Sequence, residues 1–98
     1  MKRPSEIQIN QFQLALLFDS EQMVLYNDLL ADNVFCSHCG NVAKKGITVE
    51  EVYLTNLNDI RVRGTCKLCN HKVSRIFEFG EDEAFYNKAK DLRNSMTN

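Results

Sequence analysis

Two Cys-x-x-Cys pairs hold all four cysteines of this 98-residue chain, Cys36 with Cys39 and Cys66 with Cys69. Two residues between the cysteines allow one tight turn to direct both sulfurs at a common point. A second such turn completes the tetrahedron that Zn²⁺ prefers, at a Zn–S distance of about 2.3 Å. Because residues 40–65 separate the pairs, the chain must fold back on itself to join them. The spacing therefore predicts one zinc ion per chain, bound by these four cysteines.

Other uses of four cysteines fit this chain less well. A disulfide framework needs an oxidising compartment, whereas the N-terminal residues lack the apolar run of a secretory signal or a membrane span, so we expect a cytoplasmic protein. A thioredoxin-like redox role uses one pair and leaves the second unexplained. Iron in the same thiolate site stays open, because sulfur ligands also suit iron. A mixed site in which His38 or His71 replaces a cysteine stays open as well.

A catalytic site is difficult to assemble from these residues. Catalytic zinc keeps a coordination position open for water, and four thiolates close it. His38 and His71 both stand beside the cysteine pairs, which leaves no independent base for a Ser-His or Cys-His catalytic pair. The zinc deaminase pattern also fails, since neither histidine begins His-x-Glu and no proline precedes Cys66. We therefore expect that the protein is not an enzyme.

Length and composition indicate one compact domain. Apolar residues make up 44% of the chain, enough for a modest core, and domains of this size often recruit a metal to reach stability. Within that domain we expect three parts: a helical N-terminal segment over residues 1–33, a metal-bearing module over residues 34–80, and a C-terminal helix and tail over residues 81–98.

The segment before the first cysteine pair predicts helix. Asp19 and Ser20 supply a cap, and apolar residues recur at helical spacing through residues 20–31. Residues 7–18 carry two signals, because their apolar residues alternate as in a strand and also share one helical stripe. Their Leu, Gln and Ala content favours helix. Apolar residues all round such a helix imply burial on two sides, against the metal-bearing module or in a homodimer or partner surface.

Between and after the cysteine pairs the composition changes to β-branched and aromatic residues. Residues 46–54 and 59–64 predict a hairpin joined by turn-forming asparagines, and residues 71–79 predict a third strand that ends at Gly80. Residues 81–93 begin with acids and end with bases, which matches a helix dipole. The predicted class is α+β: a three-stranded antiparallel sheet with the metal at one end, a helical N-terminal segment and a short C-terminal helix.

The two cysteine pairs resemble the knuckles of the zinc ribbon family. Each pair is followed by a residue type that accepts a positive φ, Gly40 in the first and Asn70 in the second. The resemblance covers residues 34–80. It implies two metal-bearing turns with strands emerging from them and the four cysteines as ligands. The family includes transcription and translation factors, ribosomal proteins, mobile-element proteins and enzyme appendages, so the resemblance leaves the activity open.

The charge distribution is consistent with two kinds of partner. A net charge of −1 argues against a strongly basic, sequence-independent nucleic-acid binder. Residues 61–80 are nevertheless basic, and their cations could grip phosphates or simply keep an exposed sheet face soluble. The candidate contact residues, named here the basic strip, are Arg61, Arg63, Lys67, Lys72 and Arg75. We expect a protein-binding adaptor, regulator or inhibitor that does not enter a membrane. The alternative is nucleic-acid binding through the basic strip.

Overall fold

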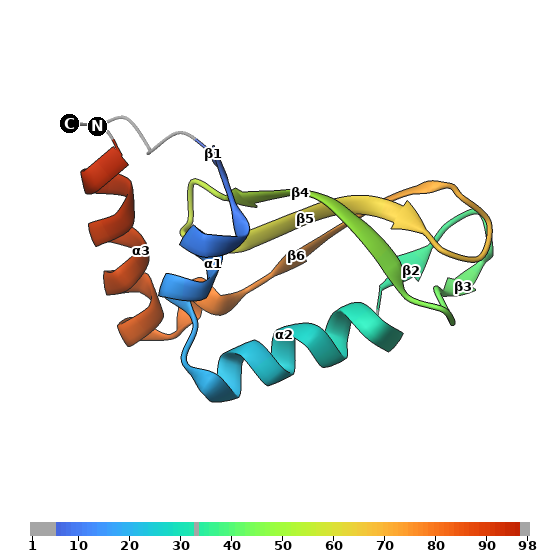
Figure 1. Ribbon diagram of the computed structural model, residues 1–98, viewed down its shortest axis with the longest axis horizontal. Coiled ribbons are helices and arrows are strands. Elements are labelled where there is room, and N and C mark those ends of the chain that lie inside the picture. Colours follow the sequence, from blue (N-terminus) through green and yellow to red (C-terminus); the bar gives the residue numbers. More distant parts are fainter. Residues whose placement is uncertain (1–5, 33, 97–98) are drawn as a thin grey trace.

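The computed structural model describes residues 6–32 and 34–96. The described residues form six strands, three helices and one 3₁₀ turn (Figure 1). In chain order the elements are β1 (Ile7–Ile9), α1 (Gln11–Leu17), α2 (Ser20–Asp32), β2 (Phe35–Cys36), β3 (Asn41–Val42), β4 (Ile47–Leu54), β5 (Ile60–Cys66), β6 (Lys72–Phe77), η1 (Phe79–Glu81) and α3 (Glu83–Met96).

The main sheet is antiparallel with strand order β1-β4-β5-β6, and β2 and β3 form a separate small hairpin. The predicted α+β class is confirmed, as are the hairpin of β4 and β5 and the third strand β6. That strand ends at Phe77 and not at residue 79 as predicted, because the 3₁₀ turn η1 begins at Phe79. The sheet has one more strand than predicted, because Ile7–Ile9 pairs with β4 opposite Leu54 to Val52. The C-terminal helix predicted over residues 81–93 begins at Glu83 and continues to Met96, beyond its predicted end. Residues 97 and 98 lie outside the described part of the chain.

Both signals in residues 7–18 were real, and each applies to a different half. The alternation at Ile7 and Ile9 is strand β1, so the helix prediction is wrong there and right for α1. Asn10 separates the two elements by a reciprocal cap. Its Oδ1 accepts from the backbone N–H of Gln13 at 2.8 Å, and the Gln13 side chain accepts from the backbone N–H of Asn10 at 2.9 Å.

The same reciprocal arrangement begins the next helix. Asp19 Oδ1 accepts from the backbone N–H of Gln22 at 2.7 Å, and Gln22 Oε1 accepts from the backbone N–H of Asp19 at 3.0 Å. Helix α2 then runs to Asp32, in agreement with the prediction for residues 20–31. The cap lets the chain turn after α1, so that two helices replace a single long one.

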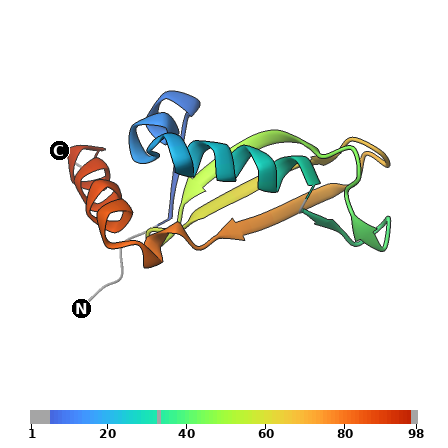
Figure 2. The same cartoon turned by 90° about the horizontal axis from the view of Figure 1, so that it is seen from below.

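The core lies between α2 and one face of the sheet, as Figure 2 shows. Strand alternation directs Leu54, Ile60 and Val62 to this core face, where each is fully buried. An aromatic cluster joins the N-terminal helices to α3. Phe18 is 5.1 Å from Tyr26 and 5.7 Å from Phe85 between ring centroids. The opposite face of the sheet, named here the open face, carries the polar side chains of β4 and β5.

Helix α3 stands at one end of the sheet, and the β2–β3 hairpin lies at the other (Figure 1). The first cysteine pair, at the β2–β3 hairpin, and the second, at the facing end of β5, therefore lie far from the C-terminal helix (Figure 1). At the hairpin end β4 contains a bulge between Val49 and Glu51, where the strands approach closely. A Cβ on Gly64 would lie 2.2 Å from the carbonyl oxygen of Thr48, so only glycine fits this position.

Candidate metal centre

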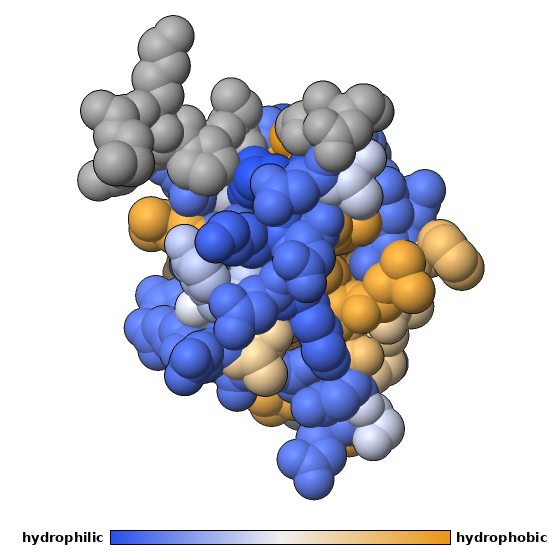
Figure 3. Space-filling view, turned by 90° about the vertical axis from the view of Figure 1, so that its left-hand side faces the viewer, coloured by the Kyte–Doolittle hydropathy of each residue, from blue (hydrophilic) through white to orange (hydrophobic). Residues whose placement is uncertain are grey.

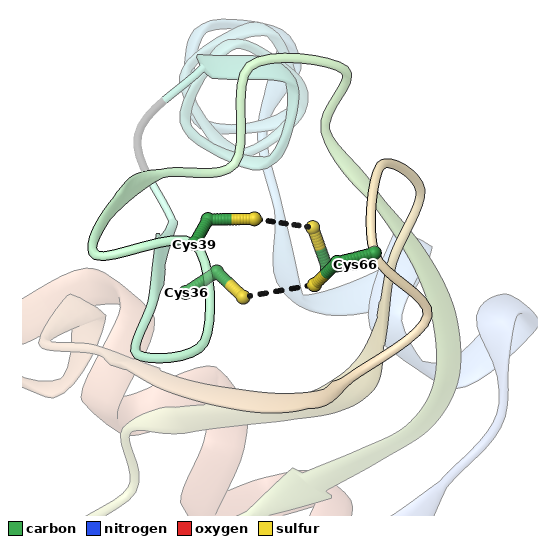
Figure 4. A group of neighbouring side chains, drawn as sticks. Cys36, Cys39 and Cys66 are labelled. Atoms are coloured by element: carbon green, nitrogen blue, oxygen red, sulfur yellow. Dashed lines mark hydrogen bonds between the residues drawn. The ribbon is translucent and has the colours of Figure 1, made fainter.

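Four cysteine sulfurs converge at the hairpin end of the molecule. Cys36 Sγ lies 3.5 Å from Cys69 Sγ, and Cys39 Sγ lies 3.9 Å from Cys66 Sγ. All four sulfurs lie within 4.8 Å of one another. A tetrahedron with Zn–S bonds of about 2.3 Å has S···S edges of about 3.8 Å. Figure 4 shows Cys36 and Cys39 directed from one turn toward Cys66 on the facing turn. The predicted four-cysteine cluster is present, with the spacing that a tetrahedral metal requires.

The two turns, named here the knuckles, have matching backbone geometry. In the first, the N–H of Gly40 donates to the carbonyl oxygen of Cys36 at 3.0 Å, and in the second, the N–H of Asn70 donates to that of Cys66 at 2.9 Å. Gly40 has φ +71° and Asn70 has φ +63°, as the sequence predicted. The first knuckle closes the short antiparallel hairpin of β2 and β3, and the second closes the longer one of β5 and β6, so a paired backbone presents each pair of sulfurs.

A loop that the sequence did not single out joins the knuckles to the rest of the fold. The N–H of Lys67 in the second knuckle donates to the carbonyl oxygen of Gly46 at 3.1 Å. Gly46 has φ +76°, and a Cβ there would lie 3.3 Å from the carbonyl oxygens of Leu30 and Ala31 at the end of α2. Its only signal in the sequence is a glycine directly before a β-branched run. The loop fixes the distance between α2, the second knuckle and the start of β4.

Backbone amides and neighbouring thiols shift the pKa values of two cysteines in the cluster. The N–H groups of Cys69 and Leu68 lower the pKa of Cys66 to about 7, because they hydrogen-bond to its thiolate. Hydrogen bonding with Cys69, followed by burial, raises the pKa of Cys39 to about 12. A bound Zn²⁺ would be ligated by the deprotonated cysteines, since zinc binds thiolates.

Two histidines lie beside the cluster and limit a mixed ligand set. The rings of His38 and His71 stack at 3.9 Å between centroids with 7° between their planes, and both residues are exposed. Ligand atoms of the two histidines and Cys69 lie within 4.8 Å of one another. An imidazole nitrogen binds a metal near its ring plane, and two parallel stacked planes share no such point. One ion could therefore not bind both histidine rings in their planes, which favours the four cysteine sulfurs as the ligand set.

The fold divides the basic strip. Arg61 and Arg63 share the open face of β5, and Lys72 lies opposite Thr65 on the same face. Arg75 is three residues beyond Lys72 and therefore lies on the core face, with its Cζ 5.4 Å from the Phe77 ring centroid. Lys67 lies apart from these residues, at the second knuckle. The period of a strand could have revealed this division from the sequence.

Acidic side chains accompany the cations of the open face. Glu6 forms an ion pair with Arg61, whose guanidinium also lies 4.8 Å from the Tyr53 ring centroid. Lys72 Nζ lies 2.7 Å from Glu50 Oε1. Across the strands, Glu51 faces Arg63. Three acids therefore balance the three cations that the strip places on this face.

Searches against protein-family models, curated proteins and solved structures give no significant match. The resemblance to zinc ribbons consequently rests on the two knuckles themselves. Through residues 6–32 and 34–96, each helix is too short or too polar to traverse a lipid bilayer.

Proposed function

We propose that this chain is a non-catalytic zinc-binding module that acts by binding another protein. The observation that carries the proposal is the exposed apolar side of α1, where Phe12 is 72% exposed and Leu16 is 57% exposed. These residues are four apart and lie on one face of the helix. On the opposite side Leu14 and Leu17 are fully buried in the core.

An apolar residue exposed singly is ordinary, but a short helix that is apolar on two sides is not. Burying one large apolar side chain contributes about 1.5–3 kcal/mol, so covering both Phe12 and Leu16 would contribute substantially to binding. Figure 3 views the end of the molecule that bears α3 and shows apolar side chains gathered along one side. This arrangement supports a protein partner that covers α1.

The charge balance of the open face supports the same proposal. Nucleic-acid binding draws its affinity from a surplus of cations facing phosphates. The open face instead opposes Arg61, Arg63 and Lys72 with three acids, and the whole chain has a net charge of −1. Nucleic-acid binding by the basic strip is therefore the alternative, and the experiment below must distinguish it from protein binding.

The metal has a structural role in this proposal. Four thiolates complete a tetrahedral shell and leave no position for a substrate or water. Zinc bound by Cys36, Cys39, Cys66 and Cys69 would fix the two knuckles against each other and so hold the end of the sheet. The partner would then bind to surfaces of the folded module and not to the metal.

Affinity capture from the native cell, with and without nuclease, tests the proposal. We expect captured proteins to survive nuclease treatment and to be lost from the Phe12→Ser and Leu16→Ser variants. Val24→Ser is the matched control, because Val24 is an exposed apolar residue on α2. Capture that disappears with nuclease, falls steeply with salt and fails for Arg61→Ala or Arg63→Ala would instead establish nucleic-acid binding. Capture unaffected by Phe12→Ser and Leu16→Ser would reject α1 as the binding surface.

A further inference from the structure

Three lysines line a groove at the hairpin end of the molecule. Its volume is about 320 Å³, and it lies between the C-terminal end of α2, the loop before β4 and the second knuckle. Lys44 and Lys45 come from the loop and Lys67 comes from the knuckle, and all three side chains are exposed. The fold thus brings together cations that the sequence places in separate segments. Only Lys67 belongs to the basic strip.

Backbone contacts fix the shape of this groove, named here the lysine groove. The N–H of Gly46 donates to the carbonyl oxygen of Ala43 at 2.9 Å, and the N–H of Lys67 donates to the carbonyl oxygen of Gly46 at 3.1 Å. A Cβ at Gly46 would lie 3.3 Å from the carbonyl oxygens of Leu30 and Ala31, so the loop packs directly against α2. The three lysines therefore extend from a backbone that is held on both sides.

The cations of the lysine groove have no acidic partner among the described side chains. Neither Lys44 nor Lys45 nor Lys67 forms an ion pair within residues 6–32 and 34–96. No aspartate or glutamate is among the described residues that line the groove, and residues 34–49 contain none. The open face, by contrast, sets an acid beside each of its three cations. Within the described part of the chain, the lysine groove therefore has a local surplus of positive charge.

We propose that the lysine groove binds an acidic segment of the partner protein, with an apolar side chain in the groove and carboxylates on the lysines. The inference rests on the proposed protein-binding role and uses a surface other than α1. Ile47 is buried and Leu30 is half-buried, so the apolar lining lies deeper than the exposed lysines. An ammonium group donates hydrogen bonds and accepts none, so the lysines select acceptors with negative charge.

The lining favours a peptide over a nucleic acid. Proteins that bind single strands combine cations with aromatic side chains that stack on the bases, and none of the described lining residues is aromatic. Asn27 also lines the groove, and its amide can both donate to and accept from a peptide backbone. The apolar lining has no counterpart on a sugar-phosphate backbone. An acidic peptide that carries an apolar residue matches the lysines, the apolar lining and the amide together.

Fluorescence anisotropy of the zinc-loaded full chain tests the proposal, with a short glutamate-rich peptide that has one central leucine as the probe. We expect saturable binding that weakens as salt is raised, since exposed charges are screened. Combining Lys44→Gln with Lys45→Gln should weaken binding by about fivefold or more, because each exposed ion pair contributes modestly. Combining Lys88→Gln with Lys90→Gln on α3 changes the net charge equally and should leave binding unchanged.

NMR spectroscopy of the nitrogen-15-labelled chain locates the bound peptide. The backbone amides of Gly46 and Lys67 should shift on titration, whereas those of α1 should not. Phe12→Ser should bind the peptide like the parent chain, because Phe12 lies outside the groove. Failure of the peptide to bind, with nuclease-resistant capture through α1 preserved, would reject the lysine groove and leave the proposed function standing.

Four other outcomes would overturn the proposal. The first is equal binding of a matching peptide with glutamine in place of glutamate. The second is tighter binding of an oligothymidylate of equal charge, which would make the groove a nucleic-acid site. The third is equal affinity of the two double variants. The fourth is weaker zinc binding by Lys44→Gln with Lys45→Gln while peptide affinity is unchanged, which would assign these lysines to balancing the thiolates of the cluster.

Discussion

Arg93 Nη2 donates a hydrogen bond of 2.6 Å to the carbonyl oxygen of Thr55. The same nitrogen donates to Asn58 Oδ1 at 3.0 Å, and all three residues are buried. Asn58 has φ +59° and lies in the turn between β4 and β5. One side chain of α3 therefore fixes the turn of a hairpin whose other end carries the second knuckle.

Replacing Arg93 should detach α3 from this turn. We expect Arg93→Met to lower the free energy of unfolding by about 2–3 kcal/mol, because it leaves the Thr55 carbonyl oxygen without a charged donor. Urea unfolding followed by circular dichroism measures the change. Lys90→Met on the exposed part of the same helix is the control and should unfold at the parent midpoint. Equal midpoints for Arg93→Met and Lys90→Met would show that the contact contributes nothing measurable.

Metal removal should unfold the hairpin end. Structural zinc in small peptides binds with an apparent free energy of about 10–16 kcal/mol, comparable with the whole stability of a small domain. Elemental analysis of freshly reduced protein should find one zinc per chain. A chelator, or Cys36→Ser or Cys66→Ser, should remove the slow-exchanging amides of β2, β3 and the second knuckle. A variant without zinc that melts like the parent chain would contradict a structural metal.

Two glycines should respond differently to substitution. Gly64→Ala should cost about 3 kcal/mol or more, because its Cβ would collide with the backbone of Thr48 and not with a movable side chain. Gly40 has open space around its Cβ position, and the matching position of the second knuckle carries Asn70. Gly40→Asn should therefore change stability by less than about 0.5 kcal/mol. Thermal melts of the zinc-loaded variants give both values, and a reversed ranking would reject this account of the bulge.

The buried hydroxyl of Tyr26 should be dispensable. It has no hydrogen-bond partner within the described residues, and burial raises the pKa of Tyr26 to about 12. An unpaired buried polar group costs about 1–3 kcal/mol, so Tyr26→Phe should raise the melting temperature by about 4 °C or more. Calorimetry measures the shift, and ultraviolet titration of the parent phenol checks the pKa. A lower melting temperature for Tyr26→Phe would indicate that the hydroxyl has a partner.

The Glu50–Lys72 ion pair should make the stability of the protein depend on pH in the acidic range. Hydrogen bonds from Lys72 and then Thr65 lower the pKa of Glu50 below its ordinary value. Since the folded pKa is below the unfolded one, the pair stabilises the protein above the unfolded pKa and loses that effect as the pH falls through the folded pKa. Carboxyl NMR titration should show the depressed pKa in the parent chain and a higher one in Lys72→Met. An unchanged Glu50 titration in that variant would exclude Lys72 as its cause.

Some parts of the fold were predictable because their causes are local. The knuckles need two cysteines two residues apart and a residue that accepts a positive φ, and Cys36 to Gly40 and Cys66 to Asn70 contain both. The caps, the hairpin and α3 follow from neighbouring residues in the same way. Residues 7–18 were harder, because their alternation and their helical stripe cannot both apply to the same residues.

Sequence alone determined the candidate ligands, the α+β class and most of the strands, since these depend on spacing and periodicity over a few residues. Tertiary structure decided what depends on residues far apart in the chain. Pairing with Leu54 made Ile7–Ile9 a strand, and Glu6 met Arg61 across the same sheet. Contact with the hairpin turn buried Arg93, while the absence of a covering element within the described residues left Phe12 exposed. The physical reason is that burial and ion pairing are properties of the assembled surfaces, which no short segment specifies.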